Sequence, residues 1–149
     1  VEVLIEKRTG EPHAFQFPGN SPACGALAFH EIRANGEQDA VKRCSGGLSC
    51  PAQAKERLKH FVSRSALDID GLGDKQIDEF WSYDLLRTPV DIFKLYQLAD
   101  EAPEIWLYTS GKNKGKLKDS LTKLFRAIEQ AINPDLDRFL FALGIRHVG

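Results

Sequence analysis

The sequence lacks several features that would place it in a membrane or outside the cell. No apolar run approaches the roughly 20 residues that a membrane-spanning helix needs. The chain begins at Val1 with neither a Met nor the charged-then-apolar order of a signal peptide, as we expect of a piece excised from a longer protein. Its three cysteines are an odd number, which is a poor basis for a secreted disulfide framework. We therefore expect a cytoplasmic protein with no membrane partner, whose cysteines are thiols or metal ligands.

The sequence also lacks a recognisable catalytic centre. No nucleophile stands beside a general base in any motif, and no pair of carboxylates stands out from the acidic stretch of residues 68–104. The glycine- and lysine-rich segment Ser110–Lys116 fails the P-loop pattern, because Leu117 follows where that motif needs Ser or Thr. This segment is interpreted as a solvated loop, with a phosphate-contacting loop or a degenerate hairpin as alternatives. We expect no catalytic residue in this chain.

The net charge of −1 conceals a segregation of charge along the chain. Residues 41–64 contain six basic side chains and one acidic side chain, and residues 112–126 have the same balance. Because polyanion binding depends on the local field, either stretch could contact nucleic acid. The alternative is that both are solvated helix faces.

The apolar pattern predicts a mainly α-helical fold with a short β segment. Alternation over residues 1–8 predicts a strand. Residues 20–50 contain too few apolar side chains to fold without a stabilising cross-link, and a bound metal is the natural candidate for it. From Pro51 onward the spacing of apolar residues predicts helices as the regular structure.

Helix starts and buried faces can also be predicted. Thr88-Pro89-Val90-Asp91 is typical of a helix start, and we expect that helix to run through Leu98. Ile105, Trp106 and Leu107 should pin the following loop to the core. The other side chains expected to face the core are Leu58, Phe61, Val62, Ala66, Ile77, Phe80, Trp81, Leu85, Leu117, Leu121, Leu124, Phe125, Ile128, Ile132, Leu136, Phe139, Leu140 and Leu143.

Cys24, Cys44 and Cys50 have the spacing of a structural zinc site. A four-cysteine site would have its first ligand three residues before Cys24. That position holds Ser21, whose hydroxyl is a poor zinc ligand, so zinc could be weakly bound or absent. The candidates for the fourth position are water, His13 and His30. The alternative interpretation is three buried cysteines without a metal.

Two glycine-containing segments follow predicted helices. In Leu67–Lys75, two glycines can expose backbone N–H groups at the start of the next helix, which suits a phosphate. Leu143–Gly149 has a similar apolar-glycine pattern, and a repeated unit can grip a duplex without reading its bases. The DNA-binding residues expected in the two segments are Gly71, Gly73, Lys75, Gly144, Arg146, His147 and Gly149. Taken alone, each pattern also fits a simple tight turn.

Three strings, Cys50–Phe61, Asp68–Gly73 and Arg138–Gly149, are similar to the middle and C-terminal parts of bacterial NAD-dependent DNA ligases. The resemblance covers nearly the whole chain. It implies the C-terminal end of an OB-fold domain at residues 1–19, a zinc finger at 20–52, and a truncated helix-hairpin-helix DNA-binding domain at 53–149.

The resemblance also implies a function. Members of this family seal nicks in duplex DNA in replication and repair, using NAD and Mg²⁺ as cofactors. This fragment would bind the backbone of nicked double-stranded DNA without base specificity, as part of a monomeric bacterial enzyme. Its partners would be that DNA and the rest of the ligase chain. Because it lacks the adenylation domain, it should bind no NAD and be inactive by itself.

Two positions depart from the family pattern. Ser21 replaces the first zinc cysteine, which reduces the implied metal site to Cys24, Cys44 and Cys50. A longer loop from Trp106 to Lys118 replaces a compact glycine-containing turn, so the DNA contact of that turn does not carry over to this loop from the resemblance. The alternative hypothesis is a non-catalytic adaptor that binds DNA or protein through a zinc ribbon and helical hairpins.

Overall fold

The computed structural model of the chain describes residues 16–33, 35–98 and 103–145. The chain divides into two compact units, Val1–Gly46 and Gly47–Gly149. A mainly helical chain with a two-stranded sheet and a cysteine cluster confirms the expected fold class. The strand expected at residues 1–8 lies outside the described residues. None of the described helices has both the length and the apolar composition needed to cross a lipid bilayer.

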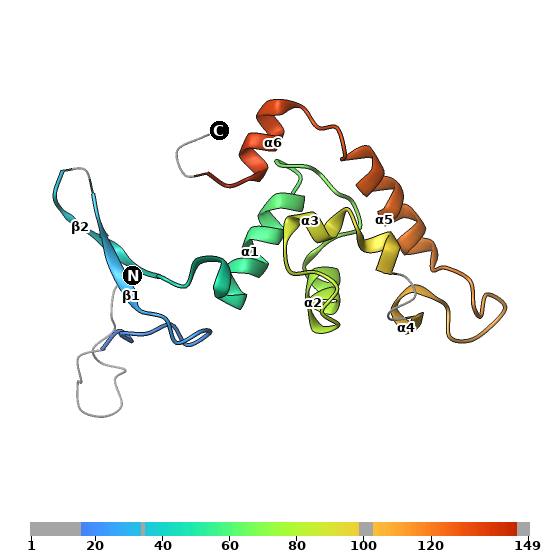
Figure 1. Ribbon diagram of the computed structural model, residues 1–149, viewed down its shortest axis with the longest axis horizontal. Helices are drawn as coiled ribbons and strands as arrows, with labels where there is room; N and C mark the ends of the chain where they lie inside the picture. The colour runs from blue at the N-terminus through green and yellow to red at the C-terminus, as the bar shows by residue number, and fades with distance from the viewer. Residues whose placement is uncertain (1–15, 34, 99–102, 146–149) are drawn as a thin grey trace, which may run out of the picture. The chain divides into compact units, whose positions relative to one another are not determined.

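The first unit contains an antiparallel sheet of two strands, β1 (Ala28–Ile32) and β2 (Gln38–Cys44) (Figure 1). The register places Ala28 opposite Cys44. The sequence analysis missed both strands, although a signal was present. Asn35-Gly36 lies between them, and this dipeptide is the strongest short-range indication of a hairpin turn.

The first unit has no hydrophobic core among its described residues. Phe29, Ile32 and Val41 are 47%, 67% and 53% exposed, and the buried side chain of this segment is the polar Ser21. Such a sheet removes too little apolar surface from water to offset the conformational entropy of folding. The expectation that a metal supports this segment stays a prediction, and the structure shows that the described apolar side chains form no core there.

The second unit is helical from its start. Its helices are α1 (Pro51–Val62), α2 (Asp74–Ser82), α3 (Pro89–Ile92), α4 (Pro103–Trp106), α5 (Asp119–Gln130) and α6 (Leu136–Ala142). Short 3₁₀ turns occupy Gly47–Ser49 and Leu95–Leu98. A proline stands at the first position of α1, as predicted, where its missing N–H group costs no helical hydrogen bond.

Trp106 lies in the core of the second unit. It is fully buried, and its ring stacks on Phe80 and Phe125 with centroid separations of 5.4 and 5.7 Å. This confirms that the segment around Trp106 is pinned to the core. Of the predicted apolar faces, the positions confirmed as buried are Leu58, Phe61, Val62, Ala66, Ile77, Phe80, Leu85, Leu121, Leu124 and Ile128.

The helix predicted to run through Leu98 is wrong in its length. α3 ends at Ile92, and the separate 3₁₀ turn at Leu95–Leu98 follows. The tighter 3₁₀ winding aligns residues three positions apart. Ile92 and Leu95, which have this separation, are both fully buried.

The predicted inward face at the C-terminal end is also wrong. Leu136, Phe139 and Leu143 are 72%, 40% and 37% exposed, and Ile132 is 57% exposed. The buried residue of α6 is instead Ala142. α6 is therefore rotated relative to the orientation that its largest apolar residues predict.

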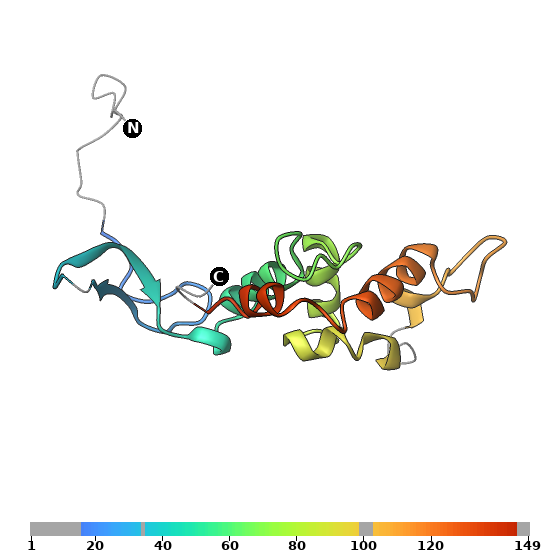
Figure 2. The same ribbon diagram turned by 90° about the horizontal axis from the view of Figure 1, so that it is seen from above.

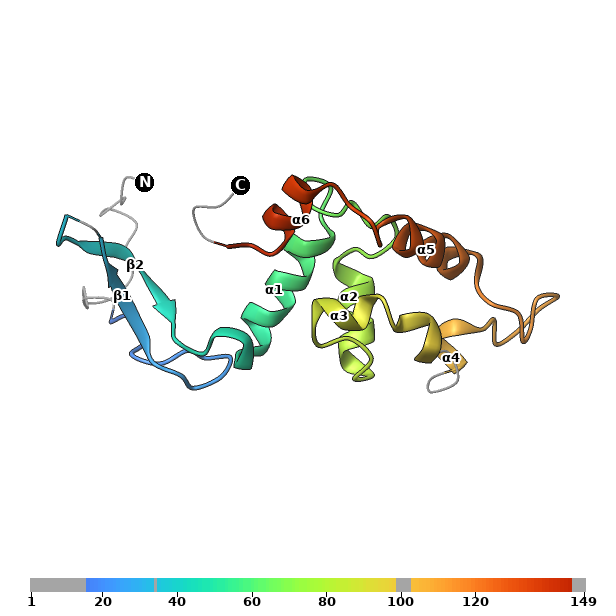
Figure 3. The same cartoon turned by 45° about the horizontal axis from the view of Figure 1, so that its top comes forward.

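Polar contacts with α1 and the turn after it explain this rotation of α6, which lies beside α1 (Figure 3). The guanidinium of Arg138 donates to the carbonyls of Arg64 and Ala66 at 2.8 and 2.7 Å. His60 Nε2 lies 2.8 Å from the carbonyl oxygen of Phe141 and must carry the proton, because a carbonyl only accepts. Charge-assisted hydrogen bonds to carbonyls near a helix end outweigh a modest gain in apolar burial.

The start of α3 provides a test of its capping. Asp91 Oδ2 accepts hydrogen bonds from Thr88 N, Thr88 Oγ1 and Arg87 N at 2.7, 2.9 and 3.0 Å. Burial opposes ionisation of Asp91, but these hydrogen bonds outweigh it and hold its pKa below the ordinary value. A lowered folded-state pKa stabilises the fold above the unfolded-state value and loses that effect as the pH falls.

We expect Asp91→Asn to lower the free energy of unfolding by about 1 kcal/mol at neutral pH. The difference from the unsubstituted chain should shrink as the pH falls below about 4, the ordinary value for Asp, and through the lower folded-state pKa. Urea denaturation across this pH range measures it. Asp137→Asn is the control, since it removes the same charge from a carboxylate outside this capping arrangement. A difference that does not change with pH would contradict the prediction.

Candidate metal centre and nucleic-acid interface

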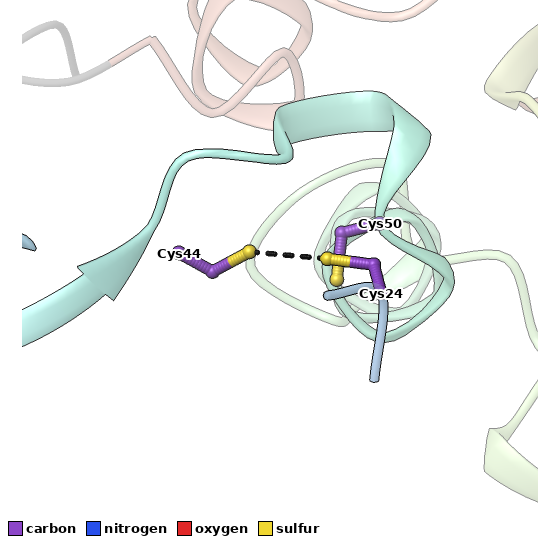
Figure 4. A group of neighbouring side chains, drawn as sticks. All are labelled: Cys24, Cys44 and Cys50. Atoms are coloured by element: carbon purple, nitrogen blue, oxygen red, sulfur yellow. Dashed lines mark hydrogen bonds between the residues drawn. The ribbon is translucent and has the colours of Figure 1, made fainter. Parts of the chain in front are cut away.

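The three cysteines predicted as metal ligands lie together. Their sulfur atoms are all within 4.8 Å of one another (Figure 4). Cys24 lies in the turn at residues 22–24, Cys44 is the last residue of β2, and Cys50 is the N-cap of α1. The Sγ atoms of Cys24 and Cys44 are 3.4 Å apart. Residues distant in the sequence thus form one cluster of potential thiolate ligands.

The dimensions of this cluster fit a zinc ion. With Zn–S bonds of about 2.3 Å, two sulfurs of a tetrahedral site lie roughly 3.8 Å apart. The observed separations bracket that spacing. The Sγ of Cys44 also accepts a hydrogen bond from the backbone N–H of Gly46 at 3.3 Å, and such a donor stabilises a thiolate. The three cysteines are therefore close enough together to bind a metal.

Ser21 makes the same kind of local hydrogen bond as the cysteine Cys44. Its Oγ accepts a hydrogen bond from the N–H of Ala23 at 3.3 Å, which matches the bond from Gly46 to Cys44 in both spacing and length. Backbone bonds from Ser21 N to Ala26 O and from Gly25 N to Ser21 O close the turn at 2.7 and 2.8 Å. The turn is thus closed by hydrogen bonds, with the Ser21 hydroxyl at the position predicted for the first ligand.

His30, which was considered for the fourth position, is not part of this cluster. His30 Nδ1 lies 2.7 Å from the carbonyl oxygen of Asp39 across the sheet, and the cluster contains cysteines alone. His13 lies outside the described residues. Three sulfurs are thus the ligand set that the structure brings together.

The first glycine segment forms a tight hairpin between α1 and α2. Gly71 has a φ of 87°, in the left-handed region that favours glycine, and a Cβ built there would lie 3.5 Å from Leu124 Cβ of α5. Gly73 is the N-cap of α2. In the described part of the chain, the N–H groups of Gly71 and Gly73 donate to no protein acceptor. These open donors are what a phosphate contact requires.

The charges around this hairpin do not all favour a phosphate. Lys75 is exposed in the first turn of α2, without an ion pair in the described residues. Asp68 and Asp70 are also exposed in the hairpin, and Asp74 lies 3.5 Å from Lys59 Nζ. The hairpin thus offers dipolar N–H groups and one lysine beside several carboxylates.

The second glycine segment is described only in part. Gly144 has a φ of 64°, and a Cβ there would lie 3.4 Å from His60 Cδ2. It therefore packs against α1 in the left-handed conformation, as a hairpin glycine would. Arg146, His147 and Gly149, which were also predicted to bind DNA, lie outside the described residues.

The two basic stretches differ in how many of their side chains form ion pairs in the described structure. In the first, Lys55 pairs with Asp78 at 2.7 Å, and Lys59 pairs with Glu56 at 2.8 Å. These ion pairs lower the pKa of Asp78, mainly through its hydrogen bond from Lys55, and raise that of Lys59, mainly through its hydrogen bond to Glu56. Residues 112–126 form no such ion pairs in the described structure. Much of the first basic stretch is neutralised internally, whereas the second is not.

Comparison with known proteins gives a consistent result. The chain is 47% identical over 150 residues to a DNA ligase of Azorhizobium caulinodans, which covers 100% of this chain and 20% of that protein. It is 48% identical over 149 residues to a DNA ligase of Nitrobacter hamburgensis, covering 100% of this chain and 19% of the relative. A DNA ligase of Mesorhizobium japonicum is 43% identical over 168 residues, with 100% and 23% covered.

This chain matches a segment of bacterial DNA ligases. The resemblance inferred from the three sequence strings is thereby confirmed. The chain spans about a fifth of the length of these DNA ligases. No protein-family model matches it.

A substitution at Ser21 tests whether the cysteine cluster holds zinc. We expect Ser21→Cys to retain about one zinc per chain at a chelator concentration that strips the unsubstituted protein, because a fourth thiolate completes the tetrahedral site. Elemental analysis after graded chelation measures this. Ser82→Cys is the control, since it adds a thiol on α2. Equal zinc retention by the two variants would contradict the prediction.

The backbone of the hairpin gives a second test. We expect Gly71→Ala to lower the free energy of unfolding by about 1–2 kcal/mol, because a side chain is strained at positive φ. Gly73→Ser should have little effect, since Gly73 has a φ of −83° and serine is a good N-cap. Urea denaturation compares the two variants. Equal losses would show that the left-handed conformation of Gly71 carries no special cost.

Proposed function

We propose that this chain is the DNA-gripping segment of an NAD-dependent DNA ligase, binding the sugar-phosphate backbone of nicked duplex DNA without base specificity. The observation that carries the proposal is the hairpin between α1 and α2. Its open Gly71 and Gly73 N–H groups stand at the N-terminus of α2 with Lys75 beside them. Backbone N–H groups recognise phosphate oxygens and carry no base information.

The proposal assigns parts of the chain to domains. Residues 1–19 would end an OB-fold domain, residues 20–52 would form a zinc finger, and residues 53–149 would begin a helix-hairpin-helix domain. The finger would use Cys24, Cys44 and Cys50 as ligands, and the bound ion would supply the structural support that the exposed sheet lacks. Bound zinc would serve folding and take no part in the chemistry.

The intact enzyme would seal nicks in cytoplasmic replication and repair, acting as a monomer with NAD and Mg²⁺. Its adenylation chemistry would reside in another part of the ligase. This segment by itself would therefore bind DNA but neither bind NAD nor join DNA ends. The similarity of the whole chain to DNA ligases supports this assignment over the stand-alone adaptor, which would bind DNA or protein without any catalytic partner domain.

The hairpin contact can be tested with Lys75. We expect Lys75→Glu to weaken binding of nicked duplex equally for unrelated sequences, and to reduce the slope of log affinity against log salt by about 1. Fluorescence anisotropy over a salt series measures both quantities. Because Lys75 is exposed, the free energy of unfolding should change by less than about 0.5 kcal/mol.

Lys75→Arg is the matched control, since it keeps the charge at the same position. It should bind as the unsubstituted chain does. An affinity that does not change with salt concentration, or one that depends strongly on base sequence, would argue against backbone recognition. Binding to a protein but not to DNA would favour the adaptor.

A further inference from the structure

The long loop between α4 and α5 is an ordered hairpin of its own. Leu107 pairs with Leu117 in an antiparallel bridge. Tyr108 N donates to Lys116 O, and Gly115 N donates to Tyr108 O, both at 2.9 Å. In Figures 1 and 2 this loop projects beyond the ends of α4 and α5. We call residues 107–118 the lysine hairpin.

The tip of the lysine hairpin is held by its own backbone. Gly111 and Gly115 have φ values of 77° and 78°, which allow the chain to reverse, and Lys116 N donates to Asn113 O at 2.8 Å. A Cβ built at either glycine would meet nothing within 4 Å. The tip is therefore shaped by local hydrogen bonds and is not packed against the helices.

The lysine hairpin carries uncompensated positive charge. Lys112, Lys114 and Lys116 are all exposed, and none forms an ion pair or side-chain hydrogen bond in the described structure. Holding three like charges within five residues costs repulsion that a polyanion relieves. By contrast, Lys55 and Lys59 on α1 already have carboxylate partners.

A groove connects the lysine hairpin with the first glycine hairpin. It has a volume of about 450 Å³, and Gly71, Gly73, Lys118 and Ser120 contribute to its walls. Lys118 ends the lysine hairpin and is the N-cap of α5, while Gly73 is the N-cap of α2. A phosphate backbone that contacts the glycine N–H groups would thus have the base of the lysine hairpin beside it.

We propose that the lysine hairpin is a second duplex contact, in which Lys112, Lys114 and Lys116 bind phosphates. This inference rests on the proposed function and adds a binding element to it. The glycine hairpin supplies open N–H groups but also the carboxylates of Asp68 and Asp70. The net attraction for a polyanion comes from the lysine hairpin, which has no acidic residue.

The test substitutes all three lysines together in the 149-residue chain. We expect Lys112→Gln/Lys114→Gln/Lys116→Gln to weaken binding of a nicked duplex at least tenfold at low salt. The slope of log affinity against log salt should fall in magnitude by about 2 to 3, since each phosphate contact contributes roughly 0.9. Because the tip packs against nothing, the melting temperature should stay the same. The matched control replaces the same lysines by arginine and should retain both affinity and slope.

The outcomes separate this inference from the proposed function. One outcome is that the glutamine variant binds as tightly as the unsubstituted chain while Lys75→Glu weakens binding. The lysine hairpin then does not contact DNA, and the proposed contact of the glycine hairpin is retained. If the glutamine variant weakens binding and the arginine variant does not, the second contact is supported. If the unsubstituted chain binds no duplex DNA at any salt concentration, both proposals are overturned.

Discussion

Gly71 lies against α5, with 3.5 Å between its ideal Cβ position and Leu124 Cβ, and the arrangement of the second unit depends on this approach. A side chain at this φ of 87° would be strained. The approach places the N-termini of α2 and α5 on the same groove. Helix packing thus uses Gly71 for its conformation, and the proposed phosphate contact would use its open N–H group.

Charge and hydrogen-bonding capacity are divided between two hairpins of this unit. The glycine hairpin has N–H groups without a protein acceptor in the described structure but carries carboxylates, whereas the lysine hairpin carries exposed ammonium groups and no acidic residue. Long-range attraction follows net charge, and close contact follows directed donors. A duplex attracted by the lysines and fixed by the glycine N–H groups would use both without reading a base.

The sequence predicted the parts of the fold that local patterns determine. The starts of α1 and α3 follow from Pro51 and from the Thr88–Asp91 pattern, and helical spacing identified the buried faces of α1, α2 and α5. It failed for α6, where hydrogen bonds from Arg138 to carbonyls distant in sequence set the rotation. Periodicity contains no information about such partners. The same limit applies to the basic stretches, since only the structure shows that Lys55 and Lys59 are paired.

The cysteine cluster was predictable from spacing, but the hydrogen bonding of Ser21 was not. Ser21 is buried, and its hydroxyl already accepts the backbone N–H that a ligand sulfur would accept. The turn is therefore closed by hydrogen bonds without a metal. The sheet of the first unit buries no apolar side chain in its described residues, so its own apolar surface contributes little to folding. In the proposed zinc finger, the Ser21 hydroxyl would preserve the turn and lower the affinity for the ion.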